Sequence, residues 1–109
     1  MDKVIIFGRE YRVEVNWRAI TNYLKSRDED SLDAMADVFK MKPSTIPGLM
    51  AACINEGERL EGRDTVVTES LLNEMAPLEA LKVVKEFADI FNSQMVPVIP
   101  EEPKKGEAW

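Results

Sequence analysis

Acidic pairs are the residues of this chain whose types and spacing come closest to catalytic chemistry. Asp30 and Asp33 form one such pair, and Glu56 and Glu58 form another. Two carboxyl groups can act as general acid and general base when burial separates their pKa values. Both pairs lie in polar segments that the sequence predicts to be exposed, so we expect them to belong to a solvated surface.

Other reactive side chains are few. The chain has no histidine and a single cysteine, Cys53. Without histidine the commonest general base and metal ligand are missing, and Cys53 lies in the apolar stretch IPGLMAACI, which predicts a buried hydrophobic residue. The segment DEDSLDAMADVF lacks the glycine and the final glutamate of a calcium-binding loop, and no glycine-rich nucleotide motif appears. We therefore expect a protein that is not an enzyme and binds no cofactor or metal.

Size and charge narrow the class further. The chain has 109 residues, 14 of them Lys or Arg and 20 Asp or Glu, for a formal net charge of −6. This length suits one domain, and the acidic excess argues against binding the nucleic-acid backbone. No apolar run approaches the roughly 20 residues that cross a bilayer, and MDKVIIFGREY is interrupted by charge too early for a signal peptide. We expect a cytoplasmic protein with no nucleic-acid or membrane partner.

The elements that would position functional residues begin with a β-hairpin. Two β-branched and aromatic runs, 3–7 and 10–15, are separated by Gly8-Arg9, which predicts a type II′ turn with glycine first. One face of the hairpin then carries the core residues Val4, Ile6, Tyr11, Val13 and Val15. The other face carries Ile5 and Phe7, two apolar side chains on what should be the solvent side.

Helical signals follow the hairpin to residue 95. Asn16 and Thr68 are suitable N-caps, Pro77 suits a first helical turn, and helices are expected over about 17–26, 31–41, 45–60, 70–76 and 77–95. Expected inward residues of these helices include Trp17, Ile20, Leu32, Met35, Ala36, Phe39 and Leu60. The predicted fold class is mainly α (α+β), an N-terminal two-stranded hairpin followed by a bundle of four to five helices. One domain should cover residues 1–97, with a flexible acidic, proline-containing tail at 98–109.

Two surfaces carry more apolar residues than one packing contact needs, and they favour a protein-binding role, although the other helices could instead cover either of them. One is the outer face of the hairpin, and the other is the last helix, which is apolar around about half of its circumference. If the stripe Leu81, Val84, Ala88 and Phe91 faces the core, a second stripe beside it is free for a partner. The predicted partner-binding residues are Ile5, Phe7, Val83, Phe87 and Ile90.

The opening segment VIIFGREYRVEVNWRAI resembles the start of bacteriophage tail assembly chaperones. In that family a strand, a glycine turn, a tyrosine and a second strand lead directly into a helix. The matching positions here are Val4, Ile6, Gly8, Glu10, Tyr11, Val13, Val15, Trp17 and Ile20. The order of the later helices is also similar, so that the likeness covers roughly residues 3–97.

This resemblance implies a non-enzymatic role in phage or prophage tail assembly. Such a chaperone holds the long tape-measure protein and helps recruit major tail-tube subunits to it in the host cytoplasm, and it could also associate with itself. Two alternatives stay open. One is a small structural head–tail or tail-completion protein of the phage particle, and the other is a cytoplasmic bacterial protein-binding adaptor.

Overall fold

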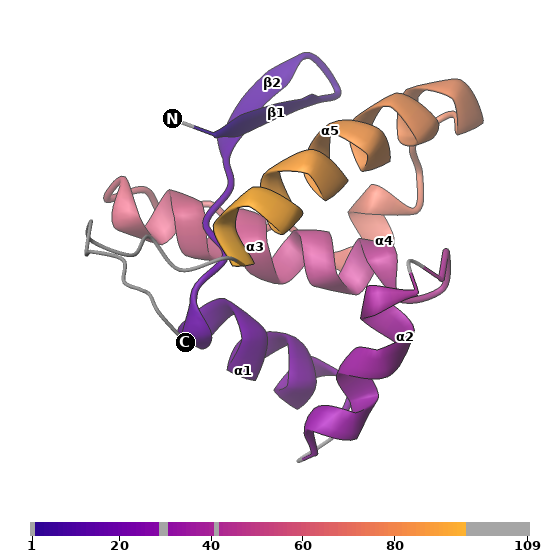
Figure 1. Ribbon diagram of the computed structural model, residues 1–109. Coiled ribbons are helices and arrows are strands. Elements are labelled where there is room, and N and C mark those ends of the chain that lie inside the picture. The colour runs from indigo at the N-terminus through magenta and orange to yellow at the C-terminus, as the bar shows by residue number, and fades with distance from the viewer. Residues whose placement is uncertain (1, 29–30, 41, 96–109) are drawn as a thin grey trace, which may run out of the picture.

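The computed structural model describes residues 2–28, 31–40 and 42–95, and it begins with the expected hairpin (Figure 1). Strand β1 (Lys3–Ile6) pairs antiparallel with β2 (Arg9–Arg12). The described elements that follow are α1 (Trp17–Ser26), the 3-10 turn η1 (Leu32–Ala34), α2 (Met35–Phe39), α3 (Ile46–Leu60), α4 (Glu69–Leu72) and α5 (Pro77–Met95). The predicted fold class is confirmed. The predicted tail at 98–109 lies outside the described residues.

The hairpin turns one residue earlier than expected, at Phe7-Gly8. Both residues have positive φ, 53° and 76°, which is the type I′ geometry that matches the right-handed twist of a hairpin. The predicted Gly8-Arg9 turn is therefore wrong, and Val4 pairs with Tyr11. Since side chains alternate with a period of two residues, this shift of the register by two leaves the same residues on each face.

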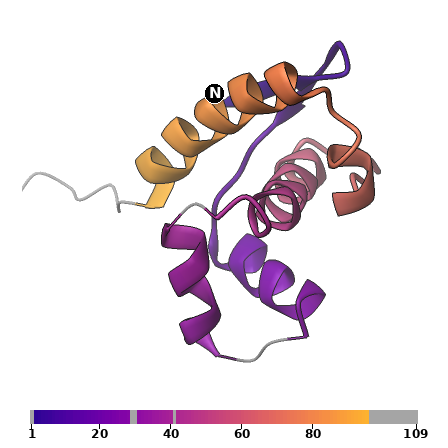
Figure 2. The same cartoon turned by 90° about the vertical axis from the view of Figure 1, so that its right-hand side faces the viewer.

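Helix α3 is the centre of the molecule. It contacts α1, α4 and β2, while α5 packs against β1. Figures 1 and 2 show the resulting arrangement, with the hairpin and α5 on one side of α3 and with α1 and α2 on the other. The chain passes from one side to the other through residues 13–16, where the Glu14 amide donates to the Cys53 carbonyl oxygen at 3.1 Å. The hairpin is thus a small cover over α3 and α5.

The core lies between these layers and is apolar. From the hairpin it receives Val4, Ile6, Tyr11 and Val13, from α3 it receives Leu49, Met50, Cys53 and Ile54, and from α5 it receives Val83, Phe87 and Phe91. The rings of Phe87 and Phe91 pack with their centroids 5.8 Å apart. An isolated two-stranded ribbon is marginal in water, so burial of its inner face against these helices accounts for its presence.

Gly57 allows the end of β2 to approach α3 closely. A Cβ atom at this position would overlap with the carbonyl group of Arg12. Any other residue would force the strand away from the helix, because the neighbour is backbone and cannot rotate aside. Gly57 therefore fixes how closely the hairpin seats on α3.

The predicted helix caps agree with the structure better than the predicted inward-facing residues do. Asn16 and Thr68 accept hydrogen bonds from Ala19 and Leu71 as N-caps, and α5 has the expected bounds. The second helix is shorter than expected: Ser31 caps the turn η1, and α2 ends at Phe39. Several residues expected to face inward are exposed instead, namely Trp17, Leu32, Ala36, Phe39 and Leu60.

Candidate functional site

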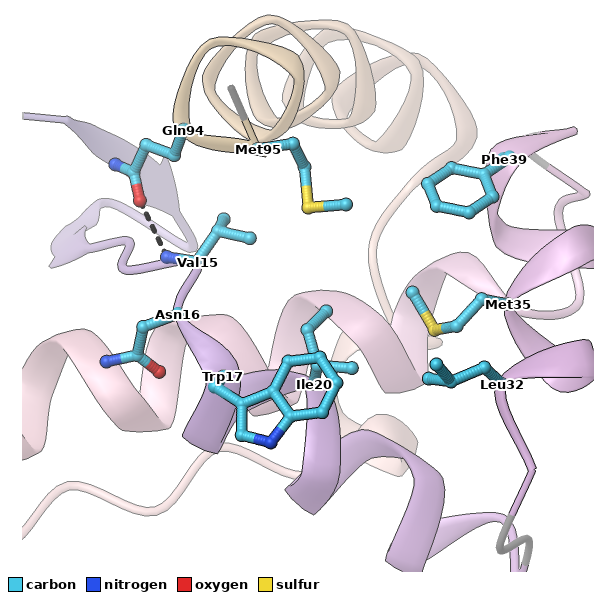
Figure 3. Close-up of a pocket in the computed structure, with 9 residues that line it drawn as sticks. All are labelled: Val15, Asn16, Trp17, Ile20, Leu32, Met35, Phe39, Gln94 and Met95. Atoms are coloured by element: carbon cyan, nitrogen blue, oxygen red, sulfur yellow. Dashed lines mark hydrogen bonds between the residues drawn. The ribbon is translucent and has the colours of Figure 1, made fainter. Parts of the chain in front are cut away.

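Most of these exposed apolar residues gather around one groove, which we call the Trp17 groove. It has a volume of about 400 Å³ and lies between α1, η1–α2 and the end of α5. Figure 3 shows its lining side chains around a common open space, Met95 above, Leu32, Met35 and Phe39 to one side, and Trp17 and Ile20 below. The lining residues are Val15, Asn16, Trp17, Ile20, Leu32, Met35, Phe39, Gln94 and Met95.

The groove has a buried floor and an exposed apolar rim. Its floor is formed by Val15, Ile20 and Met35, which belong to the core. The exposed fractions of the rim residues are 68% for Trp17, 58% for Leu32, 61% for Phe39 and 38% for Met95. Single exposed apolar residues are ordinary on protein surfaces, but a contiguous set around a hollow is typical of an interaction site.

Caps and one glutamine hold the walls of this groove in place. Asn16 caps α1 through its Oδ1, which accepts a hydrogen bond from the Ala19 amide at 2.9 Å. This cap fixes the first turn of α1, from which the Trp17 side chain projects. Gln94 accepts a hydrogen bond from the Val15 amide at 2.6 Å and donates to the Val13 carbonyl oxygen at 3.2 Å. These bonds join the end of α5 to the segment before α1, and Figure 3 shows the one between Gln94 and Val15. The polar groups of the lining are therefore engaged within the fold, and the free surface is apolar.

The acidic pair on α3 is buried, contrary to the sequence-based expectation. Glu58 is fully inaccessible and Glu56 nearly so. Glu58 accepts hydrogen bonds from Arg63 at 2.7 and 2.8 Å, from the Arg12 amide at 3.1 Å and from Thr65 at 3.1 Å. Buried charges persist in proteins when they are paired in this way. The expectation failed because the partners come from β2 and from the loop after α3.

Both carboxylates are held in the ionised form. Hydrogen bonds from Arg63 are the largest cause that lowers the pKa of Glu58, to about 2, against the opposing effect of burial. Hydrogen bonds from Arg59, at 3.0 and 2.8 Å, and then from Asn16, at 2.7 Å, lower the pKa of Glu56. A general acid or base at neutral pH needs a pKa near 7. The two glutamates instead tie β2, the start of α1 and the loop after α3 to the central helix.

Other chemistry-bearing residues are also placed in structural surroundings. Cys53 is buried and burial raises the pKa of its thiol, which keeps it protonated. Asp33 is exposed at the start of η1, and Asp30 lies outside the described residues. Within the described part of the chain, no three His, Cys, Asp or Glu side chains group together as metal ligands would, and no helix has the length and apolar character needed to span a bilayer.

The predicted partner-binding residues fall into two groups. Ile5 is exposed on the outer face of β1, as the alternation of the strand predicts, and Phe7 is exposed in the turn. Val83 and Phe87 are buried, and Ile90 is partly buried against the core. The prediction that Val83 and Phe87 lie on a free flank of α5 is wrong, since that stripe faces β1 and the core.

The stripe that the sequence assigned to the interior is free only at its start, because Phe91 belongs to the core and Val84 is partly buried against it. Leu81 is exposed, and Leu78 before it is more exposed still. Two apolar stripes of similar width run along this helix, and its own sequence contains no signal that ranks them. Likewise, nothing local to 17–39 shows that the short helix α2 leaves Trp17, Leu32 and Phe39 uncovered. The Trp17 groove was therefore missed by sequence reasoning.

Comparisons with models of known protein families, with curated proteins and with solved structures gave no match.

Proposed function

We propose that this chain is a non-enzymatic phage or prophage tail assembly chaperone that holds apolar helical segments of the tape-measure protein in the Trp17 groove. By keeping those segments covered in the host cytoplasm, it would help recruit major tail-tube subunits to the tape-measure protein. The observation that carries the proposal is the contiguous apolar rim of Trp17, Leu32, Phe39 and Met95 around a preformed hollow. The resemblance of residues 3–97 to such chaperones supplies the identity of the partner.

The shape and chemistry of the groove support an apolar helix as its occupant. Helices commonly bind in grooves through apolar side chains at helical spacing, and the lining here offers aromatic, aliphatic and thioether surface. Because Asn16 and Gln94 are already hydrogen-bonded within the fold, recognition would depend on shape and apolar area. Met and aromatic surfaces of this kind tolerate varied partner sequences, which suits binding to successive segments of a long helical protein.

The magnitude of apolar burial is adequate for reversible binding. Complete burial of a large apolar side chain contributes about 1.5–3 kcal/mol. The four rim residues are roughly 40 to 70% exposed, so covering them would contribute on the order of 4–6 kcal/mol. Association itself costs about 4 kcal/mol or more, and the partner's own apolar area must supply the remainder. This balance favours a complex that forms and releases during assembly.

Co-purification tests the proposal. The tagged chain would be co-expressed with the product of a neighbouring long, coiled-coil-rich reading frame, as wild type and as the Leu32→Ser/Phe39→Ser variant. We expect the variant to lose most of the captured partner, while its helical circular dichroism and melting temperature stay near those of the wild type. Val66→Ser is the matched control, because Val66 is 76% exposed and does not line the groove.

Undiminished capture by the Leu32→Ser/Phe39→Ser variant would contradict the proposal. The fate of the chain after assembly separates the main alternative: mass spectrometry of purified particles should not find a chaperone in the finished tail. Stoichiometric presence in the particle would instead identify a structural head–tail or tail-completion protein. Lack of any phage reading frame beside the gene would favour the bacterial adaptor.

A further inference from the structure

The end of α5 delivers the chain directly to the Trp17 groove. The helix ends at Met95, and both Gln94 and Met95 belong to the groove lining. Figure 3 shows the Met95 side chain directed toward the same open space as the side chains of Ile20 and Phe39. The residues that follow Met95 in the sequence therefore start at the groove.

The next five residues, 96–100, have the uncharged apolar sequence VPVIP and lie outside the described part of the chain. Pro97 disfavours a helical conformation of the residue before it, which agrees with the end of α5 at Met95. The spacing of Pro97 and Pro100 is that of a PxxP segment, which favours the extended polyproline II conformation. Segments of this kind dock in grooves lined by aromatic side chains, and the Trp17 groove has Trp17 and Phe39 in its lining.

Reach and chemistry both match this segment to the groove. An extended chain advances at most about 3.6 Å per residue, so Ile99 can reach at most roughly 14 Å from Met95. The segment therefore stays close to the groove, and no long loop has to close before they meet. The free surface of the groove is apolar, because Asn16 and Gln94 are already hydrogen-bonded within the fold. An uncharged segment rich in valine, isoleucine and proline suits such a surface.

We propose that residues 96–100 dock in the Trp17 groove of their own chain, with Val98 and Ile99 against its exposed rim, and so compete with the partner; the competition rests on the proposed function. A segment tethered this closely has an effective concentration on the order of millimolar. Intrinsic affinity of that same order closes the groove about half of the time. A longer apolar helix displaces the segment because it covers more apolar area. The predicted flexible tail is then shortened to residues 101–109.

Disulfide cross-linking of the free full chain tests the docking without any partner. Leu32→Cys/Ile99→Cys places one thiol on the groove rim and one in the segment, while the native Cys53 is buried. Under mild oxidation we expect a disulfide within one chain that forms at least about tenfold faster than in Val66→Cys/Ile99→Cys. The latter variant is the matched control, because Val66 is exposed but does not line the groove. Equal rates in the two variants, or a disulfide that joins two chains, would overturn the inference.

Affinity for the tape-measure protein tests the competition. Val98→Ser/Ile99→Ser should bind that partner about twofold or more tightly than the wild type, because the groove is then open in all molecules. Glu101→Ser/Glu102→Ser is the control with two serines placed just beyond the apolar segment, and its affinity should equal that of the wild type. Weaker binding by Val98→Ser/Ile99→Ser would show that the segment helps to hold the partner, and the competition would be wrong.

Failure of this inference and failure of the proposed function give different results. If only the inference fails, the rapid disulfide of Leu32→Cys/Ile99→Cys is missing, while Leu32→Ser/Phe39→Ser still loses the captured partner. If only the proposed function fails, Leu32→Ser/Phe39→Ser captures the partner undiminished, while the disulfide still forms rapidly in the free chain.

Discussion

Replacing Glu58 by glutamine should destabilise the fold by an amount that depends on pH. The carboxylate of Glu58 is fully buried and accepts bonds from Arg63, Arg12 and Thr65. Its pKa is lowered from 4.5 to about 2, which corresponds to about 3 kcal/mol of stabilisation by the ionised form. The Arg63 side chain is about half exposed, so solvent screening reduces this contribution to about 2 kcal/mol.

The side chain of Glu58→Gln also places an NH2 group in a site where Arg63 and the Arg12 amide are already donors. An unsatisfied buried donor costs about 1–3 kcal/mol, so the total loss at pH 7 should be about 3–5 kcal/mol in the free energy of unfolding. Urea denaturation followed by circular dichroism measures this quantity. Glu86→Gln is the matched control, since Glu86 is exposed on α5, and it should change stability by less than about 0.5 kcal/mol.

The pH dependence gives the result that would refute this reasoning. Because the folded-state pKa of Glu58 lies below its unfolded value, the stabilisation is present above about pH 4.5 and is lost as pH falls toward 2. The gap in unfolding free energy between wild type and Glu58→Gln should therefore narrow between about pH 5 and pH 2. Equal stability at pH 7, or a gap that stays constant with pH, would show that the Glu58 carboxylate does not stabilise the fold as an ion.

Four further substitutions test how the hairpin, α1 and α5 are held in the fold. Gly57→Ala should lower the free energy of unfolding by about 1–3 kcal/mol, because its Cβ would overlap with the Arg12 carbonyl group. Urea denaturation measures this loss, and a loss near zero would show that the strand can move aside freely. Phe87→Ser should lower the free energy of unfolding by about 4 kcal/mol or more, because Phe87 is buried in the core. Phe7→Ser should leave the melting temperature nearly unchanged, because Phe7 is exposed on the hairpin. Equal effects of the two substitutions would contradict these placements. Asn16→Ala should cost about 1–2 kcal/mol in thermal or urea unfolding, since it removes both the cap of α1 and a donor to Glu56; an unchanged stability would refute both roles.

Local signals in the sequence predict well where the helices and strands lie, and they predict poorly which of these elements pack against one another. Asn16, Thr68 and Pro77 act within one turn of their own helices, so their roles follow from neighbouring residues alone. The hairpin was also predictable. Misplacing its turn by one residue shifted the pairing register by two, which left the faces of the strands unchanged because the side-chain period is two. What sequence periodicity leaves open is which of two equivalent faces another element will cover.

The burial of Glu58 and of Phe87 shows why the packing of the elements and the Trp17 groove could not be predicted from the sequence. Glu58 looks like a surface residue of a charged helix end, and only the arrival of Arg12 from 46 positions earlier reveals its buried role. Phe87 and Leu81 occupy comparable apolar stripes of α5, and the packing of β1 against one stripe decides between them. The Trp17 groove has the same origin, since it exists only where α1, α2 and the end of α5 meet.

The most direct test of the groove as the binding site is the fluorescence of Trp17 during titration with the tape-measure protein. The chain has two tryptophans, so the Trp109→Phe variant leaves Trp17 as the only one, on the groove rim. We expect a saturable shift of its emission to shorter wavelength as the partner covers the indole, and loss of that shift in the added Phe39→Ser variant. Binding of the tape-measure protein with no change in Trp17 emission would contradict the proposed site.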